Sequence, residues 1–307
     1  MTKVGVIRGG TSNQYNESIA NGSYVLRNLP RDQYEPIDIF IDIDGTWHVG
    51  GLPLNYEKLK QRVDVIWNAL YGYYGADGQV QQLLENLNIP YTGAGPFVSS
   101  LAMNKKMTKD HLAKHGAQTP QGIYVENWGE DDREETVSLV VQSVSEKFSP
   151  PWIIEPISLV RSSGPIRAKN RNELFDTLLN AFDLSLPVLI EEEIFGKEIS
   201  VFAVPGFRNN SSYTFLPLHK ENGDYKNYFD EDDEIQKTVS NLHKKLDLGP
   251  YSSFKCVVDK RGDVSVTGIE TQPAFHPGSP LHHALKELGV TFGEFANHLI
   301  SEAMNKK

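Results

Sequence analysis

Strand-like and helix-like segments alternate over the first 95 residues, and this alternation limits the fold more than any other feature of the chain. Short apolar runs with strand character are followed by segments with helical periodicity. The strand-like runs are KVGVIRGG (3–10), YEPIDIFID (34–42), VDVIWNAL (63–70) and IPYTG (89–93), and the helical segments are ESIANGSYVLRNL (17–29) and GQVQQLLENLN (78–88). Such alternation implies a parallel sheet with helices on both faces. We predict a Rossmann-like N-terminal unit over residues 1–95.

The remaining chain predicts two further units. Residues 96–116 have the pattern of one long helix that ends at Gly116, and the chain then alternates again up to residue 186 in the manner of a small α+β unit. From residue 187 the strand-like runs lengthen, which favours a largely antiparallel sheet, and helices are expected at 234–247 and 281–304. The predicted units are therefore 1–95, 96–186 and 187–307.

Composition and charge exclude several classes of protein. The net charge is −10, and no basic cluster is long enough to follow a phosphate backbone, so nucleic acid is not an expected partner. No run of about 18 apolar residues is present, so no membrane span is expected, and the first residues lack the apolar core of a signal peptide. A single cysteine, Cys256, fits a reducing cytoplasm.

Several motifs, in one order along nearly the whole chain, resemble those of the D-alanine–D-alanine ligase family. They are GVIRGGTS (5–12), NALYGYYGADGQVQQLLENLNIPYTGAG (68–95), SLAMNKKMTK (100–109), PWIIEP (151–156), VLIEEEIFGKEISV (188–201) and DKRGDVSVTGIETQPAFHPGS (259–279). The resemblance implies a three-domain ATP-grasp fold of mixed α/β and α+β class. It also implies an ATP-dependent carboxylate–amine ligase that uses Mg²⁺ to bridge the ATP phosphates.

The resemblance places the metal ligands on the last hairpin, where this sequence departs from the family pattern. With Gly262 at the turn, the family Asp, Glu and Asn fall on Lys255, Gly268 and Glu270. A register shifted by two residues would put Glu270 on the family Glu, but it breaks the proline and serine matches. A charged lysine has no lone pair for a metal ion. We expect no magnesium site here, and we expect Lys255 to pair with Glu270 across the strands.

The nucleotide site that the resemblance implies is kept in part. Lys105 matches one of the two phosphate-binding lysines, and Glu155 stands where the family has the other. A carboxylate at that depth needs a partner, for which Arg161 and Lys105 are candidates. Glu191 matches the residue that contacts the adenine amine and Glu198 the one that contacts the ribose. These residues leave open whether the chain binds ATP, and they do not favour the binding of Mg²⁺.

The amino-acid site and its covering loops also depart from the pattern. The family Glu and His fall on Gln14 and Tyr71, and an oxyanion-stabilising Arg falls on Ser253. Glu17, one turn along, is an alternative to Gln14, although a place in the first turn of a helix suits it better. Ser162 is kept from the phosphate loop, and Tyr225 and Lys226 are candidates for the Tyr and Lys of a mobile loop.

Three interpretations follow from these departures. The first is a protein with the ligase fold that is non-catalytic for D-Ala–D-Ala ligation, because the changes gather at metal, phosphate and substrate positions. The second is an active ATP-dependent carboxylate–amine ligase for D-Ala–D-Ala or another dipeptide. The third is a sensor that binds a nucleotide or a small amino acid without turnover. The family resemblance also implies a homodimer.

Overall fold

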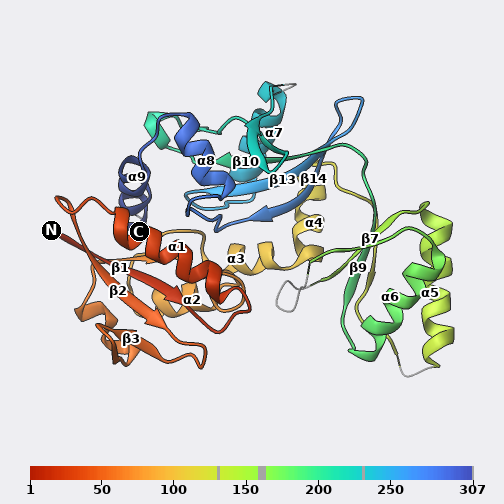
Figure 1. Ribbon diagram of the computed structural model, residues 1–307, viewed down its shortest axis with the longest axis horizontal. Coiled ribbons are helices and arrows are strands. Elements are labelled where there is room, and N and C mark those ends of the chain that lie inside the picture. Colours follow the sequence, from red (N-terminus) through yellow and green to blue (C-terminus); the bar gives the residue numbers. More distant parts are fainter. Residues whose placement is uncertain (130–131, 158–163, 230–231, 306–307) are drawn as a thin grey trace.

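Three β-sheets follow one another along the long axis of the protein in the computed structural model (Figure 1). The structure describes residues 1–129, 132–157, 164–229 and 232–305. Among these residues, no helix has both the length and the apolar character that a membrane crossing requires.

The N-terminal sheet confirms the predicted parallel core. Strands β1 (Thr2–Gly9), β2 (Tyr34–Ile41) and β5 (Val65–Asn68) are parallel, and β3 (Trp47–Val49) and β4 (Leu52–Pro53) extend the sheet antiparallel, in the order β4-β3-β2-β1-β5. Helices α1 (Tyr15–Asn28) and α2 (Gln79–Asn86) and the short 3-10 helix η1 (Tyr56–Gln61) complete this unit. The predicted fourth strand at 89–93 lies parallel beside β5 but is reduced to one isolated bridge, between Ile66 and Tyr91. Ile66 N–H donates to the Pro90 carbonyl, and Thr92 N–H donates to the Ile66 carbonyl.

The central sheet is antiparallel and has one apolar face. Its strands are β6 (Gly122–Val125), β7 (Trp152–Pro156), β8 (Ile166–Ala168) and β9 (Val188–Glu192), in the order β6-β9-β7-β8. Trp152, Ile154 and Ile190 are buried against α5 (Arg133–Lys147) and α6 (Arg171–Asp183). Side chains alternate along a strand, so the intervening residues of β7 and β9 lie on the other face.

The C-terminal sheet is antiparallel, as predicted. It contains β10 (Lys197–Ala203), β11 (Leu218–Glu221), β12 (Asp224–Asn227), β13 (Ser252–Val258) and β14 (Val264–Glu270), in the order β12-β11-β10-β13-β14. The 3-10 helix η3 (Phe207–Asn209) follows β10, and α7 (Asp232–Lys245) follows β12.

Two sequence predictions about the middle of the chain are wrong. The predicted helix over 96–116 is two helices, α3 (Pro96–Met103) and α4 (Lys105–Lys114). Asn104 leaves the helical conformation (φ −109°, ψ 111°), and its side chain accepts the Met107 N–H, so that it caps a new helix. The strand at 188–192 was assigned to the C-terminal sheet, but it pairs with β6 and β7 because its apolar residues fill the central core. The unit boundaries at 95 and 186 stay a prediction.

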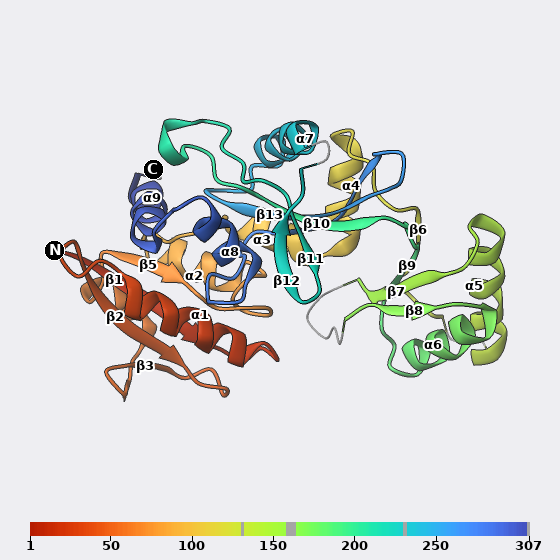
Figure 2. The same cartoon turned by 45° about the horizontal axis from the view of Figure 1, so that its top comes forward.

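Helices from one part of the chain pack on units formed by another. Leu112 of α4 lies in the apolar cluster of the C-terminal sheet. The helix predicted over 281–304 is two helices, α8 (Pro280–Glu287) and α9 (Phe292–Asn305), with Gly289 between them at φ +63°. Phe295 of α9 shares one core cluster with Trp67 of the N-terminal sheet, and Figure 2 shows α9 against that unit.

Candidate functional site

The β13–β14 hairpin turns at Gly262, as the sequence predicts, and its strand pairing has one irregularity between Lys255 and Cys256. Gly262 lies in the turn with φ +90°, a conformation that glycine adopts at little cost. Lys255 is the direct cross-strand partner of Gly268, and Ser253 is the partner of Glu270. Lys255, Gly268 and Glu270 are therefore neighbours on one hairpin.

Lys255 and Glu270 form the predicted ion pair, with 2.6 Å between Nζ and Oε1. The side chains are 59% and 42% exposed, so the pair lies at the protein surface. The Glu270 carboxylate is the main reason that the pKa of Lys255 is raised, which keeps its amine charged. A charged amine donates hydrogen bonds and has no electron pair for a metal ion.

This hairpin does not fit a magnesium ion. Mg²⁺ takes oxygen ligands, usually including one or two carboxylates. Gly268 offers no side chain, and the Glu270 carboxylate is held by Lys255. Within the part of the chain that the structure describes, no three His, Cys, Asp or Glu side chains gather as a metal site would need.

Lys105 holds the buried Glu155 carboxylate. Lys105 is the first residue of α4, its Nζ lies 3.1 Å from Oε1 of Glu155 on β7, and the two side chains are 18% and 9% exposed. The backbone N–H of Lys105 also donates to the Ile157 carbonyl. Of the two predicted partners of Glu155, Lys105 is confirmed. Arg161 lies outside the described residues, as does Ser162.

The C-terminal hairpin lies close to this buried pair. A Cβ atom at Gly268 would be 3.8 Å from Lys105 Nζ. The Glu155 charge also raises the pKa of Lys255, although less than Glu270 does. Lys105, Glu155, Lys255 and Glu270 thus form one network at the positions that the resemblance matches to the family's metal and phosphate contacts.

A second buried ion pair was not predicted from the sequence. Lys109 of α4 pairs with Glu191 of β9, the position matched to the adenine contact, and also donates to the Pro120 carbonyl. Burial raises the pKa of Glu191, and the Lys109 charge opposes that rise. The spacing in the sequence could have indicated this pair, because Lys109 follows Lys105 by one helical turn and so lies on the same face of α4. Glu198, the predicted ribose contact, is exposed on β10.

The positions matched to the amino-acid site meet between two loops of the N-terminal unit. Gln14 precedes α1, and a Cβ atom at Gly72 would lie 2.8 Å from its Oε1 atom, so the two loops touch. The neighbouring Tyr71 hydroxyl is buried, with no hydrogen-bond partner among the described residues. Burial is the main cause of the raised pKa of Tyr71, and the charge of Glu270 raises it further.

Glu17 and Ser253 complete this region. Glu17 lies in the first turn of α1, as expected, and its carboxylate bonds to Nε2 of His276, a contact that the sequence did not predict. His276 lies in the Pro-rich loop between β14 and α8, so this pair joins the N-terminal and C-terminal units. Ser253, at the family's oxyanion position, is buried on β13 with 3% exposure.

Tyr225 and Lys226, predicted to act together, lie on opposite faces of β12, as neighbours in a strand do. Tyr225 packs on the His283 ring, with centroids 6.1 Å apart. Burial is the main cause of its raised pKa, and the charges of Lys255 and Glu270 also act on it, so Tyr225 lies near the hairpin pair. Lys226 instead pairs with Glu221 at 2.6 Å in an exposed position. The structure brings only Tyr225 to the candidate site.

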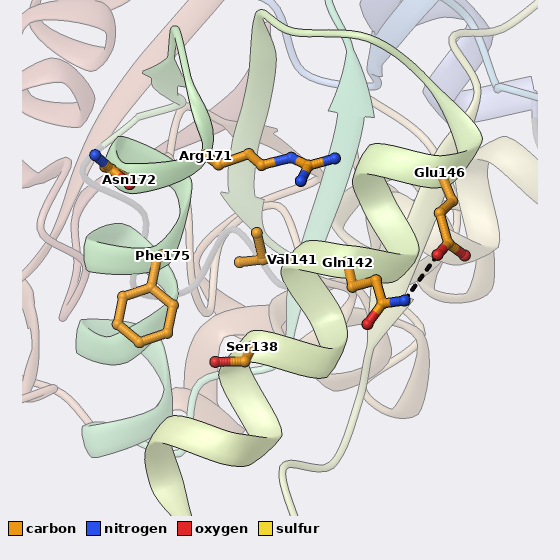
Figure 3. A pocket seen from close by; sticks show the side chains of 7 residues that line it. All are labelled: Ser138, Val141, Gln142, Glu146, Arg171, Asn172 and Phe175. Carbon is orange, nitrogen blue, oxygen red and sulfur yellow. Dashed lines mark hydrogen bonds between the residues drawn. The ribbon is translucent and has the colours of Figure 1, made fainter.

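A surface hollow of about 410 Å³ lies elsewhere, between α5 and α6 (Figure 3). Its lining includes Arg171, Gln142 and Phe175, and Gln142 donates to Glu146 across one helical turn. In Figure 1 these helices lie at the outer end of the molecule, with β7 and β9 between them and α4. The hollow is therefore separate from the candidate site.

Comparison with known proteins finds relatives over nearly the whole chain. The chain is 29% identical to the D-alanine–D-alanine ligase of Clostridium perfringens over 98% of both chains. It is 27% identical to that of Chlorobium luteolum, over 99% of this chain and 97% of the relative. Along nearly its whole length the chain is thus similar to D-alanine–D-alanine ligases. No model of a protein family matches the sequence.

Solved structures support the ATP-grasp fold of the chain. The D-alanine–D-alanine ligase of Coxiella burnetii superposes with a TM-score of 0.87 at 22% identity, over 99% of this chain and 96% of the other. The Bacillus anthracis enzyme, crystallised with ATP, superposes with a TM-score of 0.81 at 23% identity, over 99% and 98%. The fold class predicted from the motifs is thereby confirmed.

Proposed function

We propose that this chain is a D-alanine–D-alanine ligase-like protein that does not carry out magnesium-dependent D-Ala–D-Ala ligation. The observation that carries the proposal is the Lys255–Glu270 ion pair of 2.6 Å on the hairpin that resembles the family's metal hairpin. An ammonium group repels a divalent cation at short range. With Gly268 opposite Lys255, no second carboxylate stands at the matched positions to outweigh that repulsion.

The buried Lys105–Glu155 pair supports the same proposal. The carboxylate of Glu155 repels phosphate where the resemblance places a lysine, and it holds the remaining lysine at 3.1 Å. A phosphate group would have to displace Glu155 from Lys105 and leave a buried carboxylate alone. Breaking a buried pair in this way costs about 3–5 kcal/mol.

A second candidate is an active ATP-dependent carboxylate–amine ligase. It is favoured by the full-length similarity to ligases, one relative of which was crystallised with ATP. It is also favoured by the exposed Glu198, matched to the ribose contact. Nucleotide binding without turnover would make the chain a sensor.

The homodimer and the cytoplasmic location stay predictions. Sedimentation analysis tests whether the chain forms the homodimer.

Calorimetric titration of ATP and ADP, with and without Mg²⁺, tests the proposal. Phosphate release is measured in parallel with D-alanine present, and the C. perfringens relative serves as the positive control. We expect no magnesium-dependent binding and no phosphate release. Magnesium-dependent binding together with phosphate release would overturn the proposal in favour of the active ligase. Binding that does not depend on Mg²⁺ would indicate the sensor.

A restored variant makes a negative result informative. Glu155→Lys, Lys255→Asp, Gly268→Glu and Glu270→Asn together return the residues that the resemblance implies. We expect this variant to gain magnesium-dependent nucleotide binding if these positions are the ones that matter. A folded variant that still binds nothing would show that the loss lies elsewhere in the chain.

A further inference from the structure

Two ion pairs cross the space between α4 and the central sheet. Lys105 pairs with Glu155 of β7 at 3.1 Å, and Lys109 pairs with Glu191 of β9. We call these four residues the α4 clasp. The two lysines are one helical turn apart on α4 and therefore face the same way.

The two glutamates of the α4 clasp share one face of the central sheet. In the antiparallel pairing of β7 with β9, Glu155 lies opposite Leu189 and Glu191 lies opposite Ile153. Directly opposed residues in such a pair project from the same face, as do alternate residues of one strand. This face is the one turned away from α5 and α6, whose core is filled by Trp152, Ile154 and Ile190.

α4 belongs to the C-terminal side of this contact. Leu112 is buried in the cluster of the C-terminal sheet, and Gly268 of β14 lies close enough that a Cβ atom there would be 3.8 Å from Lys105 Nζ. The α4 clasp therefore joins the central sheet to a helix that is packed on the C-terminal sheet. Figure 1 shows α4 between the C-terminal sheet and strands β7 and β9.

The carboxylates of the α4 clasp are almost inaccessible to water. Glu155 is 7% and Glu191 is 6% exposed. A buried carboxylate that loses its cation is left in a medium of low polarity, which costs several kcal/mol. Moving α4 away from the sheet would therefore require water to enter and solvate four charges.

We propose that the α4 clasp holds the central sheet closed against the C-terminal unit without any nucleotide, so that the protein has a built-in closed state. This closed state deepens the proposed function and rests on it, because the lysine that the resemblance assigns to phosphate is paired with a protein carboxylate instead.

Distance measurement between two spin labels tests the α4 clasp. One label is placed at Asn172→Cys, exposed on α6, and the other at Lys260→Cys, exposed at the tip of the β13–β14 hairpin. Cys256 can stay, because it is buried and burial raises the pKa of its thiol to about 12, which keeps it unreactive. The labelled full chain, free of nucleotide, is expected to show one narrow distribution of distances.

Neutralising the α4 clasp should release the central unit. The variant with Lys105→Gln, Lys109→Gln, Glu155→Gln and Glu191→Gln keeps the net charge, and its distance distribution is expected to broaden and shift to longer values. The exchanged pair Lys105→Glu with Glu155→Lys should stay narrow. As matched control, Arg208→Gln with Glu294→Gln removes an ion pair inside the C-terminal unit (2.8 Å) and should change nothing.

An unchanged distribution in the neutralised variant, or equal broadening in the control, would overturn the inference. If the fourfold variant does not fold, Glu155→Gln and Glu191→Gln are tested singly and judged by the same criterion. The same labelled wild-type chain is then titrated with ATP and Mg²⁺. Magnesium-dependent binding together with phosphate release would overturn the proposed function, whereas the α4 clasp is judged only by the distances measured without nucleotide.

Discussion

At the scale of single residues, the main feature of the candidate site is that its carboxylates form ion pairs with lysines. Glu155 has 9% of its side chain exposed, and Lys105 lies 3.1 Å away. An acid in this position cannot stay charged and alone, because burial penalises the charge by several kcal/mol. The sequence predicts two candidate partners for Glu155, and the position of α4 in the structure decides between them.

We expect Glu155→Gln to lower the free energy of unfolding by about 3 kcal/mol, because Lys105 would lose its partner in a buried place. Chemical denaturation of the variant measures this. The double variant Lys105→Met with Glu155→Met leaves neither charge and should recover most of the loss. A double variant as unstable as the single one would contradict this account.

The Glu17–His276 pair should make stability depend on pH. Burial disfavours the charged imidazole, but the hydrogen bonds to Glu17 and to the Pro277 carbonyl outweigh it and raise the pKa of His276 above its ordinary 6.5. A raised folded-state pKa means that the stabilisation is complete below pH 6.5 and is lost as pH rises through the raised value. The nearby His282 has a lowered pKa, mainly through burial, so its own contribution is lost on acidification.

Unfolding free energies of the wild type and of Glu17→Gln, measured between about pH 5 and about pH 9, separate these effects. The difference between the two proteins should be largest at the acidic end and should shrink as pH rises. His282 is present in both proteins and cancels to first order. A difference that grows with pH would refute the assignment.

At the scale of elements, Asn104 decides how α4 presents its lysines. Its side chain accepts the Met107 N–H and ends the helical run that the apolar pattern predicts across residues 96–116. The break lets α4 take its own direction from α3. Lys105 is the first residue after the break and therefore depends on it.

We expect Asn104→Ala to lower the free energy of unfolding by about 1 kcal/mol, as loss of a helix cap commonly does. It should also broaden the spin-label distances across the α4 clasp. Asn170→Ala removes the equivalent cap of α6, whose side chain accepts the Glu173 N–H, and provides the control. It should cost similar stability without affecting the distances, and equal broadening would disprove the link.

At the scale of the whole molecule, α9 joins units that the sequence predicts separately. Phe295 is fully buried, and its ring lies 5.5 Å from that of Phe275 and 6.3 Å from that of Tyr251. The same cluster contains Trp67 of β5. The last helix of the chain thus completes a core that begins with the first sheet.

Phe295→Ala should lower the free energy of unfolding by about 3–5 kcal/mol, because it empties a large site in a packed core. Hydrogen exchange should show weaker protection in both β1 and β13. Leu178→Ala in the central core is the control and should affect β7 and β9 first. Loss of protection confined to β13 would show that the two units do not depend on α9 together.

The sequence by itself determined the fold class, through motifs that resemble those of the ligases, and the Lys255–Glu270 pair, through the alternation of two strands joined by the glycine turn at 262. It could not determine which sheet β9 joins, where the long helix breaks, or that Lys109 meets Glu191. Each of these depends on which surfaces meet after the units pack, and apolar patterns do not specify their partner. Only the tertiary structure decided that buried lysines and glutamates neutralise one another between α4 and the central sheet, since the interaction of two charges depends on their distance in space and not along the chain.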